Sequence, residues 1–224
     1  MGWKKPTKDG VIFDLDGTLL DTIEDIAAAM NRVLEKRSFE PYTIEAYKTL
    51  VGEGVEEMVH RALPGRTLGG EEVAAIVRDY RSEYELCWRE HSRPYPGIPE
   101  LLGELGRQRV RTAVLSNKSH AFTEAMIHGL LPAFRFDVIR GAMPGVPLKP
   151  DPEPALRIAR EMGVAPASVV FLGDTKIDMK TALAAGMFPV GALWGFRSAD
   201  ELGANGAAAL IVSPLELLPF FQAG

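Results

Sequence analysis

The sequence has one cysteine, four histidines and no excess of basic residues. Cys87 can form neither an internal disulfide nor a thiolate zinc site, so a reducing compartment is expected. The 25 Lys and Arg residues are outnumbered by 30 Asp and Glu, which gives a net charge of −5 at pH 7. Nucleic acids and anionic membranes select basic surfaces, so neither is expected as a partner.

Long apolar runs are also absent. No stretch approaches the ~20 apolar residues of a membrane-spanning helix. Met1–Pro6 has neither the apolar core of a signal peptide nor the pattern of a myristoylation site. The chain of 224 residues is 46% hydrophobic, which is enough to bury a full core. These observations predict a cytoplasmic globular protein, either one large domain or a core domain with an insertion.

The most informative segment begins with the apolar run Val11–Phe13, which is followed at once by Asp14-Leu15-Asp16-Gly17-Thr18. The apolar run favours a buried strand, and strand alternation places Asp14 and Asp16 on the same side. Two ionised carboxylates about 4 Å apart repel by about 4 kcal/mol at an effective dielectric of about 20. A cation or a shared proton would offset that repulsion, so the segment indicates a functional site. The alternative is an Asp-Gly turn with solvated acids.

Between Asp21 and His91 no segment has the pattern of a strand, whereas three apolar stripes have helical spacing. The first helix is expected near Thr22, with Thr22 and Asp25 as a capping box. The stripes are Ile23, Ile26, Ala27, Met30, Val33 and Leu34, then Val55, Met58, Val59, Ala62 and Leu63, then Val73, Ile76, Val77, Tyr80, Tyr84, Cys87 and Trp88. The sequence therefore predicts a compact helical bundle inserted after the first strand.

A linker follows, punctuated by Pro94, Pro96, Gly97 and Pro99. Beyond it strands and helices alternate. The expected strands are 110–116, 136–139, 169–172, 189–193 and 210–212, and the expected helices are 121–128, 153–161 and 176–185. This alternation is typical of an α/β fold with a doubly wound, Rossmann-like parallel sheet. We therefore predict an α/β core domain of residues 1–18 and 94–224 and a small all-α domain of residues 19–93.

Sites in such sheets lie beyond the carboxyl ends of the strands, and polar residues do follow the later strands. Ser116-Asn117-Lys118 ends one strand and suits a phosphate oxygen, although Ser116 or Ser119 could instead cap the next helix. Lys149, held in a Lys-Pro-Asp-Pro segment, could meet phosphate oxygens or offset clustered acids. The alternative for Lys149 is an exposed lysine ahead of a helix.

Two further acids, Asp174 and Asp178, follow the strand 169–172. The helix dipole alone would favour an acid at Asp178 but explains less of Asp174. Together with Asp14 and Asp16 they form a set of carboxylates with few imidazoles, which selects a hard divalent cation, most often Mg²⁺. A metal, an ammonium and a hydroxyl are the groups that hold a transferring phosphoryl group.

In this order, the motifs resemble those of the haloacid dehalogenase superfamily. The family pattern reads D-x-D-G-T, a strand-terminal Ser or Thr, a Lys and an acidic pair. The helical insertion resembles the family's small α-helical cap. Several segments are similar to the phosphoglycolate phosphatase branch: 51–54, 93–97, 115–118, 149–152 and 194–196. The resemblance implies a phosphoric monoester hydrolase that acts on a small phosphorylated metabolite, with 2-phosphoglycolate as the best single guess.

The resemblance also implies catalytic roles. Asp14 would be the nucleophile that forms an aspartyl-phosphate, and Asp16 the general acid and base. Ser116 and the Asn117 amide would hold phosphate oxygens, and Lys149 would neutralise charge on the phosphate and the nucleophile.

For the cofactor, the resemblance implies Mg²⁺ bound by Asp14, the Asp16 carbonyl and Asp174. Asp178 would be a ligand or would act through a water molecule. An acid at the position of Asp16 fits phosphatases and argues against dehalogenation.

The substrate contacts implied by the resemblance are Thr18, Glu53, Gly54 and Lys118. The loop Gly52-Glu53-Gly54 would reach the active site, although it could be a simple turn between helices. Lys118, His120 and Arg93 are candidates for binding a substrate carboxylate. His60, His91 and His128 show no metal-ligand spacing.

Several alternatives stay open from the sequence. A sugar-phosphate mutase or a pyrophosphatase of the same superfamily would keep the catalytic residues. A receiver domain uses similar groups, but there the acidic pair comes first and the domain is shorter. A non-enzymatic scaffold would be expected to lack a core motif residue. The sequence leaves the choice between a monomer and a homodimer open.

Overall fold

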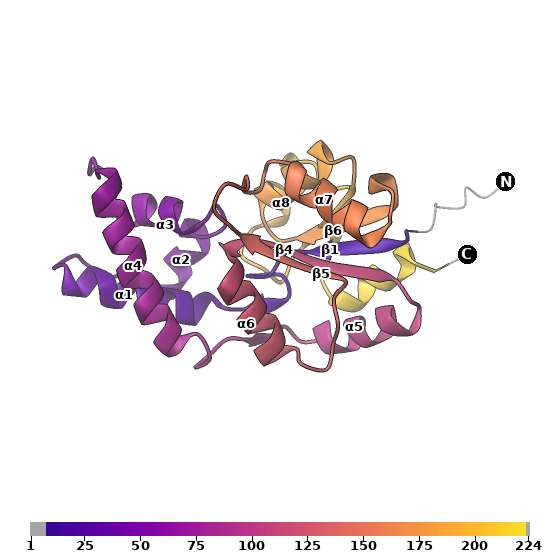
Figure 1. Cartoon of the computed structure of the whole chain (residues 1–224), viewed down its shortest axis with the longest axis horizontal. Coiled ribbons are helices and arrows are strands. Elements are labelled where there is room, and N and C mark those ends of the chain that lie inside the picture. The colour runs from indigo at the N-terminus through magenta and orange to yellow at the C-terminus, as the bar shows by residue number, and fades with distance from the viewer. Residues whose placement is uncertain (1–7, 223–224) are drawn as a thin grey trace. The chain divides into compact units, whose positions relative to one another are not determined.

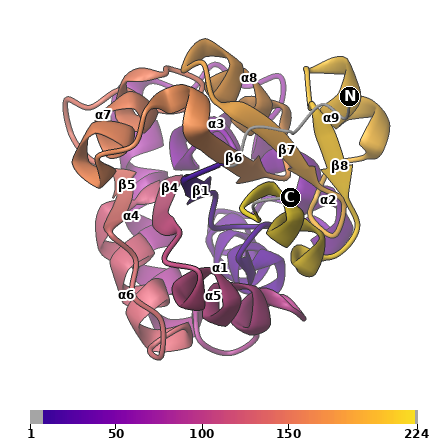
Figure 2. The same ribbon diagram turned by 90° about the vertical axis from the view of Figure 1, so that its right-hand side faces the viewer.

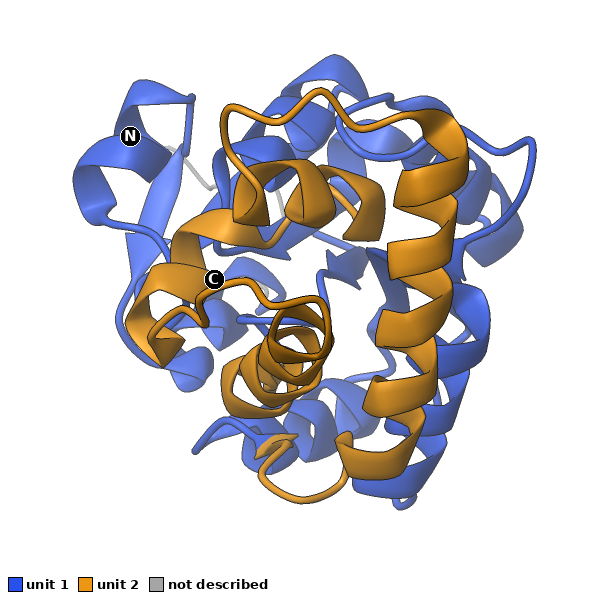
Figure 3. Cartoon of the chain, turned by 90° about the vertical axis from the view of Figure 1, so that its left-hand side faces the viewer, with its two compact units in different colours: residues 1–19, 94–224 blue, residues 20–93 orange. Residues whose placement is uncertain are grey.

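The computed structural model describes residues 8–222. The expectations made for Met1–Pro6 lie outside these residues. Of these, residues 8–19 and 94–222 form one compact unit, and residues 20–93 form another (Figure 3). The expected boundaries differ from these only at the first junction, where Leu19 belongs to the larger unit.

The larger unit is built on a six-stranded parallel sheet with the order β5-β4-β1-β6-β7-β8. The strands are β1 (Gly10–Phe13), β4 (Arg111–Ser119), β5 (Val138–Ala142), β6 (Val169–Gly173), β7 (Phe188–Ala192) and β8 (Ala209–Ile211). Strand β1 lies between β4 and β6 and is buried throughout, as its apolar sequence requires. The predicted α/β class with a doubly wound parallel sheet is confirmed.

Helices cover both faces of this sheet (Figures 1 and 2). Helices α7 (Glu153–Met162) and α8 (Lys176–Ala184) lie on one face, and α5 (Ile98–Arg107) and α6 (His120–Leu130) on the other. The remaining elements are α9 (Ala199–Ala204) and the short 3₁₀ helices η1 (Pro166–Ser168) and η2 (Pro214–Phe220). The core beneath α7 and α8 consists of Ile12, Ala113, Leu115, Ala155, Ile158, Ala159, Met162, Val169, Phe171, Ala182, Ala185 and Met187.

Strand register brings the functional motifs to one edge of the sheet. Phe13, the last residue of β1, pairs with Val114 of β4 and with Leu172 of β6. The residues that follow these three positions therefore emerge together, because parallel strands share the direction of their carboxyl ends.

The smaller unit contains four helices: α1 (Ile23–Lys36), α2 (Ile44–Leu50), α3 (Val55–Ala62) and α4 (Gly70–Cys87). Helices α1 and α3 both pack on α4, and α2 packs on α1. Short strands β2 (Leu20–Asp21) and β3 (Arg93–Pro94) pair where the chain enters and leaves this unit. Among residues 8–222, none of the helices has the length and apolar character needed to cross a lipid bilayer.

Two expectations about individual elements are wrong. The linker ends at Gly97, whose left-handed conformation (φ +88°) precedes α5, and Pro99 lies in the first turn of that helix. Proline in a first turn costs no hydrogen bond, so it starts this helix rather than extending the linker. Strand β5 begins at Val138, later than expected, because its pairing with Ala113 of β4 fixes its position.

The expected capping box at the start of α1 is also wrong. Thr22 is the N-cap residue, but its side chain makes no capping hydrogen bond. The carboxylate of Asp25, fully buried, instead accepts hydrogen bonds from the backbone N–H of His91 (3.0 Å) and Ser92 (2.8 Å) and from Ser92 Oγ (2.7 Å). A carboxylate committed to these distant donors is not available to cap its own helix.

Candidate active site

Asp14 lies at the carboxyl end of β1, where its backbone N–H continues the ladder by donating to the Leu172 carbonyl (2.9 Å). Its side chain is 9% exposed. Asp14 Oδ1 lies 2.8 Å from Nζ of Lys149 and accepts a hydrogen bond from the backbone N–H of Leu15 (2.7 Å). The strand end thus presents a buried carboxylate whose orientation is fixed by two donors.

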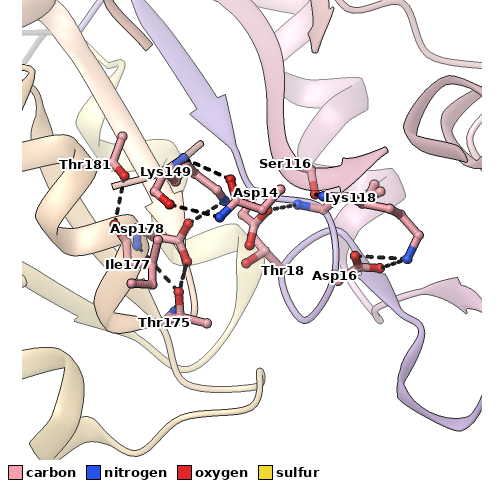
Figure 4. A network of polar contacts seen from close by, with 12 residues as sticks. Asp14, Asp16, Thr18, Ser116, Lys118, Lys149, Thr175, Ile177, Asp178 and Thr181 are labelled. Atoms are coloured by element: carbon pink, nitrogen blue, oxygen red, sulfur yellow. Dashed lines mark hydrogen bonds and ion pairs between the residues drawn. The ribbon is translucent and has the colours of Figure 1, made fainter. Parts of the chain in front are cut away.

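Lys149 also contacts Asp178, so its ammonium bridges two carboxylates (Figure 4). Its Nζ lies 2.7 Å from Asp178 Oδ1, and its side chain is 2% exposed. Of the two alternatives for this residue, the exposed lysine is therefore wrong. Sequence spacing could not show that Lys149 meets both acids, because they lie in distant parts of the chain.

Asp178 is held in place by Thr175 at the start of α8. Thr175 donates from its backbone N–H (3.0 Å) and its Oγ1 (2.6 Å) to Asp178 Oδ2, and its Oγ1 accepts from the backbone N–H of Asp178. This is a capping box, and the T-x-x-D spacing in the sequence is its signature. Thr175 was not predicted as a site residue, although that signal was present.

Asp174 follows β6 and is fully buried. Its Oδ1 accepts from Thr18 Oγ1 (3.0 Å) and its Oδ2 from the backbone N–H of Phe196 (2.8 Å). A Cβ atom at Gly17 or Gly195 would overlap the Asp174 side chain. Both glycines therefore make room for this carboxylate. The positioning roles of Gly195 and Phe196 were not found from the sequence.

Asn117 ties the end of β4 to the segment that carries Lys149. Its side-chain amide donates to the Lys149 carbonyl (3.0 Å), and its side-chain oxygen accepts from the Lys149 backbone N–H (2.9 Å). Ser116 Oγ accepts from the backbone N–H of Lys118 (3.2 Å). Neither serine caps the following helix with its side chain as the alternative required, since the N-cap residue is Ser119 and makes no such bond.

Lys118 pairs with Asp16, on the other side of Asp14 from Lys149 (Figure 4). The ammonium lies 2.9 Å from Oδ1 and 3.0 Å from Oδ2 of Asp16. Of the two acids of the D-x-D segment, Asp14 therefore pairs with Lys149 and Asp16 pairs with Lys118.

Burial and mutual repulsion perturb the acids of this site. Burial, and next the charge of Asp178, raise the pKa of Asp14 well above its ordinary value, although Lys149 opposes this shift. The same two causes raise the pKa of Asp174 to about 7. Burial disfavours the charge on Lys149, yet Asp14 and Asp178 raise its pKa above the ordinary value.

The chemistry of these donors fits a hard cation. One carboxylate oxygen from each of Asp14, Asp174 and Asp178 lies within 4.8 Å of the others. Lys149 contributes a single positive charge to a group of three buried carboxylates. Oxygen ligands and an excess of negative charge are the features that Mg²⁺ sites share, whereas soft metals prefer sulfur and imidazole.

Not every candidate residue lies in this cluster. Glu53 and Gly54 belong to the helical unit, where the carboxylate of Glu53 pairs with Arg61. Arg93 also belongs to that unit. His120 Nδ1 accepts a hydrogen bond from the Gly141 backbone N–H (3.3 Å), so this nitrogen of the ring holds the backbone of β5 in place.

The helical unit brings Asp25, Glu90 and His91 together, a grouping that the histidine spacing did not indicate. Both oxygens of Asp25 already accept hydrogen bonds from the segment at His91 and Ser92. These hydrogen bonds join α1 to the segment after α4, and they explain why the three residues lie together.

Comparison with known proteins assigns the family. The haloacid dehalogenase-like hydrolase family matches residues 11–192, which include every residue of the cluster above. The chain belongs to this family. The predicted family and the predicted hydrolase class are thereby confirmed, and a receiver domain is excluded.

Three relatives illustrate the similarity. A phosphoglycolate phosphatase from Pseudomonas putida is 32% identical over 93% of this chain and 78% of its own length. An N-acetylmuramic acid 6-phosphate phosphatase from Pseudomonas aeruginosa is 31% identical over 96% of this chain and 95% of its own. A crystal structure from Lactobacillus delbrueckii subsp. bulgaricus, provisionally assigned as a phosphoglycolate phosphatase, superimposes with a TM-score of 0.90. It is 28% identical and covers 97% of this chain and 100% of its own.

Proposed function

We propose that this protein is a Mg²⁺-dependent phosphatase that hydrolyses a small phosphomonoester, with 2-phosphoglycolate as the leading substrate. The observation that carries the proposal is the buried carboxylate of Asp14 at a strand end, 2.8 Å from the Lys149 ammonium and close to two further acids. The Pseudomonas putida relative, a phosphoglycolate phosphatase, supports this substrate. The relative that is an N-acetylmuramic acid 6-phosphate phosphatase shows that similar chains differ in substrate.

In the proposed first step, an Asp14 oxygen attacks phosphorus and the bond from phosphorus to the ester oxygen breaks. The leaving oxygen takes a proton from Asp16, which yields the alcohol and an aspartyl-phosphate. In the second step Asp16 removes a proton from water, whose oxygen attacks phosphorus. The bond between Asp14 and phosphorus then breaks, releasing inorganic phosphate and restoring the carboxylate.

The other residues hold charge in place during these steps. We propose that Ser116 and the backbone amide of Asn117 bind phosphate oxygens at the carboxyl end of β4, just before α6. Lys149 would neutralise charge on the phosphate and on Asp14, and the side chain of Asn117 fixes the backbone that carries this lysine. Fixed donors of this kind stabilise a transition state without having to reorganise.

Asp14, Asp174 and the Asp16 carbonyl are the proposed Mg²⁺ ligands. One oxygen of Asp178 is already paired with a cation, the Lys149 ammonium, and the other accepts two hydrogen bonds from Thr175, which supports the water-mediated role among the two roles expected for it. When bound, Mg²⁺ supplies positive charge that offsets the charge of the phosphoryl oxygens.

The helical unit is proposed to serve as the cap, with Glu53 and Gly54 as substrate contacts in addition to Thr18 and Lys118. We further propose a cytoplasmic protein that acts alone or as a homodimer on small phosphorylated metabolites. Neither nucleic acid nor membrane is needed for this function.

A panel of phosphorylated metabolites assayed with Mg²⁺ tests the substrate. The expected result is a kcat/KM for 2-phosphoglycolate above that for other monoesters, whereas a flat profile would count against it. Analysis of the products distinguishes the alternatives. Release of inorganic phosphate from a monoester identifies a phosphatase, an isomeric sugar phosphate identifies a mutase, and cleavage of pyrophosphate in preference to monoesters identifies a pyrophosphatase.

The Asp14→Asn variant tests the nucleophile. An amide cannot form the acyl-phosphate, so turnover of every substrate should disappear while the fold persists. Steady-state rates and the circular dichroism of the purified variant measure the two effects. A folded variant that retains even a tenth of the wild-type rate would remove Asp14 from this role.

A further inference from the structure

Lys118 and Asp16 form an ion pair beside the nucleophile. Both carboxylate oxygens of Asp16 lie within 3.0 Å of the ammonium, and the side chains of Lys118 and Asp16 are only 8% and 18% exposed. In Figure 4 this pair lies on one side of Asp14, and Lys149 with Asp178 lies on the other. A second ammonium is thus placed next to the proposed general acid rather than next to the proposed nucleophile.

The fold fixes the backbone from which Lys118 extends. Its N–H donates to Ser116 Oγ (3.2 Å), and its carbonyl accepts from Thr123 Oγ1 (3.3 Å). Strand β5 packs closely against this backbone at Gly141. A Cβ atom at that position would lie only 2.6 Å from the Lys118 carbonyl oxygen. The lysine is therefore held at the sheet edge by its surroundings and is not an ordinary surface residue.

We propose that Lys118 is a specificity-determining residue whose ammonium binds a carboxylate of the substrate while it remains paired with Asp16. The inference rests on the proposed function, in which Asp16 meets the leaving oxygen. An ammonium carries three N–H donors and can therefore bridge two carboxylates, as Lys149 does in the same site.

The distances define the substrate class. A general acid works within about 2.6–3.2 Å of the oxygen it protonates. Since the ammonium lies within 3.0 Å of both Asp16 oxygens, it lies no more than about 6 Å from the leaving oxygen. A carboxylate on the carbon bonded to the leaving oxygen falls within this reach. Phosphomonoesters of short 2-hydroxy acids have this arrangement. Phosphate esters of simple alcohols have no carboxylate that could bind the ammonium.

A matched pair of substrates tests the proposal. We would measure kcat/KM for 2-phosphoglycolate and for ethyl phosphate, with Mg²⁺, in the wild type and in Lys118→Met. The preference for 2-phosphoglycolate, expressed as the ratio of the two values, should fall on the order of ten- to a hundred-fold, because one charge-assisted contact is lost. Lys118→Arg keeps the charge and should retain most of the preference.

Lys180→Met, an exposed lysine on α8, is the control for removal of a positive charge from the same unit and should leave the ratio unchanged. A purely structural role for Lys118 would lower both kcat/KM values of Lys118→Met by the same factor, and that result would overturn the proposal. A wild-type enzyme with no preference for 2-phosphoglycolate over ethyl phosphate would also overturn it.

Binding supplies a second measurement that does not need turnover. Calorimetric titration of Asp14→Asn and of the double variant Asp14→Asn/Lys118→Met should show weaker binding of 2-phosphoglycolate, but not of ethyl phosphate, when Lys118 is replaced. Equal affinities of the two proteins for 2-phosphoglycolate would refute the role of Lys118. Absence of phosphatase activity in the wild type would refute the proposed function instead, and the titration would still decide the question about Lys118.

Discussion

At the residue scale, one buried lysine keeps three neighbouring acids together. Lys149 Nζ contacts Asp14 at 2.8 Å and Asp178 at 2.7 Å, and Asp178 adds repulsion to both Asp14 and Asp174. Charges this deeply buried are tolerated only when each is paired or coordinated. The stability of the larger unit and its chemistry should therefore depend on the same side chain.

Lys149→Met removes the charge and leaves an unbranched side chain that is one atom shorter. In the absence of metal, we expect the free energy of unfolding to fall by about 3–5 kcal/mol, because buried carboxylates lose their partner. Mg²⁺ should stabilise this variant, yet phosphatase turnover should be lost, since a metal does not replace the ammonium on the phosphate. Urea unfolding in EDTA and in Mg²⁺, together with rate measurements, would follow both effects.

Lys180→Met again serves as the control and should unfold as the wild type does. If Lys149→Met were as stable as Lys180→Met in EDTA, the ammonium would contribute nothing to holding the acids.

At the element scale, the sequence was most informative for buried strands and least informative for short helices. Strands β1 and β6 are apolar runs that end in polar residues, so the residue pattern alone located their carboxyl ends. Helix α5 was missed, although Ile98, Leu101, Leu102 and Leu105 have helical spacing, because Gly97 and Pro99 suggested a linker. Helix α2 has only seven residues, too few for a clear period.

Asp25 joins the first turn of α1 to the segment at His91 and Ser92, where the chain leaves the helical unit. We expect the stability of this unit to depend on these contacts. Asp25→Ala would leave the buried backbone N–H of Ser92 without its acceptor, along with Ser92 Oγ and the N–H of His91. A loss of about 2–4 kcal/mol in the free energy of unfolding is expected, since each unsatisfied buried donor costs about 1–3 kcal/mol. Denaturant unfolding of the full chain measures it.

The matched control is Asp79→Ala on α4, an acid whose side chain is 53% exposed and pairs with Arg37. An exposed ion pair contributes at most about 1 kcal/mol. Equal destabilisation by the two substitutions would contradict the role assigned to Asp25.

At the scale of the whole molecule, the charges of the site link stability to pH and to metal. The pKa of Asp174 is raised to about 7 in the folded protein, from 3.8, and that of Asp14 is raised as well. The folded state therefore binds these protons more tightly than the unfolded state. The resulting stabilisation is fully present below the ordinary pKa and disappears as pH rises through the folded value.

In the absence of metal, we expect the free energy of unfolding of the wild type to fall relative to that of Asp174→Asn as pH rises from about 4 to 8. The fall should be about 1.4 kcal/mol for each unit by which folding raises the pKa of Asp174. Mg²⁺ competes with these protons, so its stabilising effect should increase over the same range. Thermal unfolding of wild type and Asp174→Asn in EDTA and in Mg²⁺ would measure both trends. A wild type that differs from Asp174→Asn by a constant amount at every pH would contradict this account.

The sequence by itself determined which residues meet at the edge of the sheet. Buried strands need apolar residues, parallel strands share one direction, and so the polar residues after each strand must converge. Only the tertiary structure decided how the converging groups pair. Lys118 contacts Asp16 across 102 positions of sequence, and Lys149 contacts Asp178 across 29. Such pairs depend on strand register and on the paths of the loops, which come from packing the whole chain and leave no local pattern.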